Sequence, residues 1–159
     1  MRRFACLVGA LAVLSCARVF AIGVGVQGTA VLTTHEGDGG VAVTLKLDNI
    51  PCMFTVSVLS FHDPVAVGVR ADWIKRSTIV GPWQWYRGIG AAAELDLAPG
   101  FFKIGAGPRF TIGTDVLLVN DFLELYAQAA WQPMLFVGTD AGCFHPFSIP
   151  LDIGVRFWF

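Results

Sequence analysis

The stretch that decides the fold closes the chain: "PFSIPLDIGVRFWF", residues 146–159. Every second residue from Phe147 is apolar, through Ile149, Leu151, Ile153, Val155 and Phe157 to Phe159. The positions between them are Ser148, Pro150, Asp152, Gly154, Arg156 and Trp158. Successive side chains of a strand point to opposite sides, so this stretch predicts a strand with one apolar and one mostly polar face. Such a strand fits a soluble sheet with its apolar face inward, or a membrane barrel with that face outward.

The composition favours the membrane. Hydrophobic residues make up 55% of the 159 residues and charged residues only 14%, against about 25% in an average soluble domain. A soluble domain of this length would need more charge on its surface. The net charge of −1 gives no basic stripe of the kind that nucleic-acid binding requires.

Residues 1–21 have the layout of a secretory signal peptide: Arg2 and Arg3, an apolar run, then small residues before Ile22. The apolar run is shorter than the ~20 residues of a spanning helix. We expect cleavage before Ile22, with a barrel formed by residues 22–159. A second interpretation stays open, in which Cys16 ends a loose lipoprotein box and is lipidated; both interpretations predict export.

Alternation of apolar and polar residues predicts an all-β, eight-stranded, antiparallel up-and-down transmembrane barrel. The expected strands lie near 22–33, 41–47, 53–61, 65–75, 84–97, 101–112, 121–132 and 147–159. Turn chemistry marks the connections at 35–40, 48–51, 62–64, 76–82, 98–100, 113–120 and 138–146.

The polar faces of these strands carry balanced charge. The expected interior charges are Lys46, Arg70, Lys103, Arg109 and Arg156 against Asp72, Glu94, Asp96, Glu124 and Asp152. Charges removed from bulk water must be paired or hydrogen-bonded, since an unpaired charge costs on the order of several kcal/mol. This balance favours a narrow polar interior, whereas a lipocalin-like soluble barrel would be apolar inside. A closed barrel of eight strands is the smallest in which side chains alone can fill the interior.

The C-terminal strand resembles the insertion signal of bacterial outer-membrane barrels, which end in an aromatic residue after alternating apolar positions. The match falls on Leu151, Ile153, Val155, Phe157 and Phe159. Trp residues near the predicted strand ends are typical of membrane–water girdles. The chain is similar to small barrels such as the transmembrane part of outer-membrane protein A and outer-membrane protein W, and to short spirochaetal barrels. The resemblance implies location in the bacterial outer membrane and recognition of the last strand by the barrel assembly machinery.

Several residues fit this pattern less well. Pro108 lies within a predicted strand, where we expect a bulge or kink because proline lacks an N–H. Pro133 is expected where the seventh strand leaves the membrane. Arg87 falls on the lipid-facing side close to Trp85, and we expect its long side chain to extend to the lipid headgroups. Cys52 and Cys143 are expected at opposite ends of the barrel as free thiols, with a disulfide as the alternative in an oxidising compartment.

Few residues suggest chemistry. His35, His62 and His145 fall in loops on one predicted rim without metal-ligand spacing, so we expect no metal and no cofactor. His145 and Ser148 lack an evident orienting carboxylate, and we expect no enzyme of the lipid-modifying kind.

Two functions remain open. The first is a narrow pore or passage for small or hydrophobic solutes, in which interior residues such as Lys103 and Glu124 would set selectivity. The alternative is a closed barrel with a structural or surface-interaction role, in which the interior charges pair across the lumen and the loops carry the function.

Overall fold

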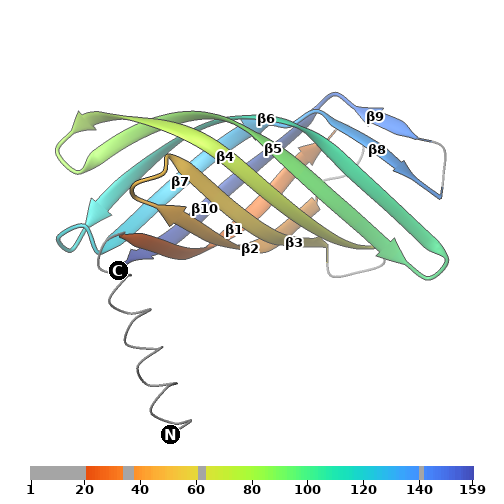
Figure 1. Cartoon of the computed structure of the whole chain (residues 1–159), viewed down its shortest axis with the longest axis horizontal. Helices are drawn as coiled ribbons and strands as arrows, with labels where there is room; N and C mark the ends of the chain where they lie inside the picture. The colour runs from red at the N-terminus through yellow and green to blue at the C-terminus, as the bar shows by residue number, and fades with distance from the viewer. Residues whose placement is uncertain (1–20, 34–37, 61–63, 140–141) are drawn as a thin grey trace, which may run out of the picture.

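The computed structural model describes residues 21–33, 38–60, 64–139 and 142–159. This part of the chain forms an antiparallel β-barrel (Figure 1). Its strands are β1 (Ile22–Thr33), β2 (Asp38–Leu47), β3 (Cys52–Ser60), β4 (Val65–Val80), β5 (Trp83–Ala98), β6 (Phe101–Leu118), β7 (Leu123–Trp131), β8 (Met134–Gly138), β9 (Cys143–His145) and β10 (Ser148–Trp158). No helix in the described ranges is long and apolar enough to cross a membrane. The expected signal peptide and Cys16 lie outside the described residues.

Eight of the strands close into a ring. Neighbours run β1 to β7 in chain order, and β10 then pairs with both β7 and β1. The first and last strands meet in register from Gly23 opposite Trp158 to Thr33 opposite Ser148, and Ile22 and Phe159 exchange backbone hydrogen bonds of 3.1 and 3.0 Å. The predicted eight-stranded antiparallel barrel is therefore confirmed.

The burial of side chains alternates along most of the strands, and the buried side is largely polar. In β1, Gln27 and Thr29 are buried while Val24 and Val26 are exposed. Because Cβ atoms alternate across a strand, closing this sheet with its polar face inward leaves the apolar face on the outside.

Two strands run well past their expected ends. β4 runs to Val80 and β6 to Leu118, so the predicted turns at 76–82 and 113–120 are mostly strand. The actual turns are short: Gly81 has φ +56° between β4 and β5, and Val119, Asn120 and Asp121 have positive φ between β6 and β7. The polar residues at 76–78 and 113–115 resemble turn residues, but they lie on paired strands that extend beyond their neighbours.

The loop predicted at 138–146 is partly a hairpin. β8 and β9 pair with each other. β8 also pairs with β6, on the same edge of β6 that pairs with β7. Phe110 pairs with Trp131 and Ala106 with Leu135, so the same register places Pro108 directly opposite Pro133. Of the bulge or kink expected at Pro108, the bulge is absent on the β5 side, where β6 keeps its register, and the ladder is instead interrupted on the β7–β8 side. Neither proline has an N–H to bridge the gap.

Candidate functional site

The barrel interior holds two networks of buried charge. The first is centred on Asp152 and comprises Arg70, Asp72, Arg109 and Asp152 with the amides of Gln128 and Gln132; we call it the Asp152 network. Arg109, which is 0% exposed, donates to Asp72 at 3.0 Å, to Gln132 at 2.8 Å and to Asp152 at 3.2 Å. Arg70 donates to the same Asp152 carboxylate at 3.2 Å. The Arg109 side chain, which comes from β6, thus connects β4 and β10 across the lumen.

Asp152 also accepts hydrogen bonds from uncharged side chains. Thr29 on β1 donates at 2.6 Å and Gln128 on β7 donates at 2.7 Å. With Arg70 and Arg109, these donors engage both carboxylate oxygens, as a buried carboxylate requires.

The second network is centred on Glu124, toward the end of the barrel where the described chain starts and ends. It comprises Lys46, Arg76, Asp115, Glu124, Arg156 and Trp158, and we call it the Glu124 network. One oxygen of Glu124 accepts from Arg156, from Lys46 at 3.2 Å and from Arg76 at 3.1 Å. The Trp158 indole donates to the other oxygen at 2.7 Å. Arg76 also pairs with Asp115 at 2.9 Å.

A layer of tyrosines and amides separates the two networks. Tyr86 donates to Gln128 at 2.8 Å, and Tyr126 donates to Gln27 at 2.9 Å. The Arg156 guanidinium lies 4.4 Å from the centre of the Tyr126 ring. Both tyrosines are almost fully buried, so this layer fills the lumen between the charges.

A cavity of about 420 Å³ occupies the opposite mouth of the barrel. Its charged lining residues are Glu94, Asp96 and Lys103, together with His145. The Lys103 ammonium lies 4.1 Å from the centre of the Phe136 ring, and the His145 ring lies 3.3 Å from the Cys143 sulfur. Ser148 lines the same cavity. Along β6 and β10 the cavity residues Lys103 and Ser148 come before Arg109 and Asp152, so the cavity lies on the mouth side of the Asp152 network.

The ten predicted interior charges fall into three groups. Arg70, Asp72, Arg109 and Asp152 meet in one network; Lys46, Glu124 and Arg156 meet in the other; Glu94, Asp96 and Lys103 line the mouth. The sequence missed Arg76 and Asp115, which lie on the parts of β4 and β6 predicted as turns. These two carry opposite charge, so the described interior still balances, with six cations against six anions.

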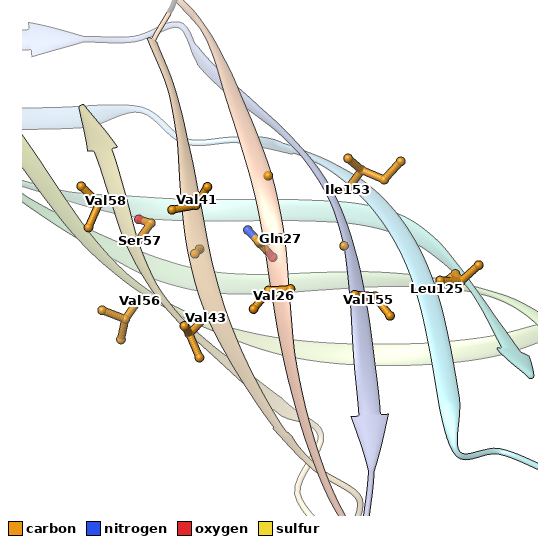
Figure 2. A pocket seen from close by; sticks show the side chains of 13 residues that line it. Val26, Gln27, Val41, Val43, Val56, Ser57, Val58, Leu125, Ile153 and Val155 are labelled. Atoms are coloured by element: carbon orange, nitrogen blue, oxygen red, sulfur yellow. The ribbon is translucent and has the colours of Figure 1, made fainter. Parts of the chain in front are cut away.

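The outer wall is apolar. Figure 2 shows the branched side chains of β1, β2, β3 and β10 on this wall, among them Val26, Val41, Val56 and Ile153. They surround an open hollow of about 1060 Å³ that Gly28 also lines, and a Cβ atom on Gly28 would meet no atom within 4 Å. No charged side chain lines this hollow.

The residues of the predicted insertion signal lie on this wall. Ile153 and Phe159 are 71% and 73% exposed, Leu151 and Phe157 are also exposed, and Val155 is partly exposed. Trp83 and Trp131 are exposed at strand ends, Trp73 is exposed in the middle of β4, and Trp158 turns into the Glu124 network.

The remaining predicted positions lie apart. Cys52 and Cys143 are free and begin β3 and β9, at opposite ends of the barrel. His35 and His62 lie outside the described residues, so the predicted histidine rim is represented by His145.

We compared the chain with protein families, curated sequences and solved structures. No family model and no curated protein sequence matches the chain. Among solved structures, Neisserial surface protein A aligns with a TM-score of 0.58 at 14% identity, covering 88% of this chain and 97% of that one. At this identity the likeness concerns the fold alone. The chain has the fold of the small eight-stranded outer-membrane barrels.

Proposed function

We propose that the chain is a small bacterial outer-membrane barrel whose lumen is closed by its own ion pairs, with a structural or surface-interaction role. The outer wall supports the membrane location, because its strands expose large apolar side chains such as Ile89 at 64% and Ile112 at 58%. Lipid accepts such a surface, and a closed ring satisfies the backbone groups within it.

Closure of the lumen rests on one observation: Arg109 is fully buried and spans from Asp72 to Asp152. The Glu124 network lies across the lumen on the other side of the tyrosine layer. Removing a partner from a buried pair costs about 3–5 kcal/mol, so a path for ions would require several costly rearrangements at once. The narrow pore that the sequence also allowed would need such rearrangements, and the geometry favours the closed barrel.

The proposal gives the chain no catalytic role, since the carboxylates at the centres of both networks are held by cations. Interaction with a partner would fall to the mouth with its cavity and to the connections between strands. The mixed lining of that cavity suits a small amphipathic solute better than a simple ion.

Conductance across a planar bilayer tests the proposal. The chain from Ile22, refolded in detergent and checked for heat-modifiable migration on a gel, is expected to produce no current above the bare bilayer. Discrete steps whose ion selectivity changes in Glu124→Gln or Lys103→Gln would instead make the lumen a pore. Folding in plain buffer without detergent would contradict the membrane location itself.

A further inference from the structure

The outer wall carries charge in one place. Among the described strand residues whose side chains face outward, only Lys75 on β4 and Arg87 on β5 are charged. They are direct register partners across the two strands, and both are exposed.

Two cations in this arrangement repel each other. The Cβ atoms of directly opposite residues lie about 4.5–5.5 Å apart, and like charges at such a pair are destabilising. No carboxylate of the described residues forms an ion pair with either side chain, whereas cations inside the barrel such as Arg70 and Arg156 do. An anion bound between Lys75 and Arg87 would turn this repulsion into attraction.

The neighbouring pairs form rows of graded polarity. Trp73 pairs with Ile89 on the side toward the middle of the wall, and Ser77 pairs with Trp85 on the side toward the β4–β5 turn. Trp73 and Ile89 are 58% and 64% exposed. Over these three rows the outward side chains change from apolar to two cations and then to hydroxyl and indole donors, which is the order of acyl chain, phosphate and headgroup in a phospholipid. The exposed Ile79 follows on β4, between these rows and the turn.

We propose that Lys75 and Arg87 bind the phosphate of an anionic phospholipid. The acyl chains of this lipid would lie against the apolar side chains that begin with Trp73 and Ile89 and continue toward the middle of the wall. Arg87 supplies a planar fork of N–H donors for the phosphate oxygens and Lys75 adds a point charge. Ser77 and Trp85 are placed to donate to the glycerol or headgroup oxygens. This inference rests on the membrane location proposed above, because only a lipid presents a phosphate beside an apolar wall.

Native mass spectrometry of the refolded barrel in a neutral detergent tests the site. The protein is mixed with equal amounts of phosphatidylglycerol and phosphatidylcholine, and the lipid retained on the folded barrel is counted. We expect retention of phosphatidylglycerol over phosphatidylcholine, and about tenfold weaker binding of phosphatidylglycerol in Lys75→Gln/Arg87→Gln. Lys75→Arg should keep the preference.

Two controls separate this site from general charge. Asn120→Asp makes the net charge more negative by one, as each of the two site substitutions does, but at an exposed residue of the β6–β7 turn, and it should leave lipid retention unchanged. Arg87→Glu should abolish the preference, because the introduced carboxylate would pair with Lys75 instead. Heat-modifiable migration shows that each variant is folded.

Equal retention of both lipids by the unmodified barrel, or full retention of phosphatidylglycerol by the double variant, would overturn the inference. Displacement of phosphatidylglycerol by millimolar inorganic phosphate would show a site for free phosphate and overturn the lipid assignment. A barrel that folds only in detergent but shows no lipid preference loses this site alone, whereas folding in plain buffer would remove the membrane location as well.

Discussion

Asp152 is the residue on which most of the interior depends. Its carboxylate accepts from Thr29, Arg70, Arg109 and Gln128, side chains from four different strands. A lone carboxylate in such surroundings would be costly, but two guanidinium groups and two neutral donors replace the water that it has lost. The residue therefore stabilises the barrel through its partners and destabilises it when they are removed.

Replacing this carboxylate by its amide should expose that dependence. In Asp152→Asn, two buried guanidinium groups lose a counter-charge, and we expect the free energy of unfolding to fall by about 3–5 kcal/mol. Urea unfolding of the barrel in lipid vesicles, followed by tryptophan fluorescence, measures it. Asp121→Asn makes the same chemical change at an exposed turn residue and should stay within about 0.5 kcal/mol. Equal stability of both variants would show that the Asp152 network contributes little.

At this scale the sequence identified the charges but not all their partners. Alternation alone placed Asp152, Arg109 and Glu124 on inward faces, because strand parity depends only on counting residues. Arg76 and Asp115 were missed because hydroxyl, Gly and Asp neighbours resemble turn residues. Which cation meets which anion follows from the stagger of strands around the ring, and no local pattern contains it.

Among the elements, the interrupted strand is the most unusual. Pro108 and Pro133 face each other in register, so β7 and β8 read as one strand with a gap opposite β6. The sequence signalled an irregularity through Pro108 but not its form, since a proline shows which donor is missing and not which neighbour loses it. The hairpin of β8 and β9 was overlooked because Gly, Thr and Asp at 138–140 favour a loop.

Two glycines test how tightly this gap is packed. A Cβ atom on Gly107 would lie well inside van der Waals contact of the Pro133 carbonyl oxygen, whereas one on Gly28 would meet open space. We expect Gly107→Ala to lower the free energy of unfolding by about 1–3 kcal/mol. Gly28→Ala should leave it unchanged or raise it by up to about 1 kcal/mol. Urea unfolding measures both, and a Gly107→Ala barrel as stable as Gly28→Ala would show that the gap can widen freely.

At the scale of the whole molecule, the predicted recognition of the last strand by the assembly machinery can be tested at Phe159. Phe159 is 73% exposed and lies edge-on to Phe122 at 5.9 Å, so it adds little to the packing of the barrel. We expect Phe159→Ala to reduce the amount of barrel in the outer membrane of an expressing cell several-fold while leaving the yield of folding from urea into detergent unchanged. Phe147→Ala removes an aromatic residue that is 60% exposed and precedes the first residue of β10, and it should affect neither measurement. A Phe159→Ala barrel that reaches the membrane at the normal level would contradict recognition of the last strand.

The two charge networks also restrict the order in which the barrel can form. Arg70 and Asp152 are separated by 82 positions, and Lys46 and Glu124 by 78, so these pairs join strands that are not neighbours in the ring. A strand that entered lipid alone would carry an unpaired charge into hydrocarbon, which is strongly unfavourable. Insertion one strand at a time is therefore disfavoured, and we expect β4 to meet β10 and β2 to meet β7 before or while these strands enter the bilayer. The ion pairs that close the lumen thus favour concerted assembly of the barrel.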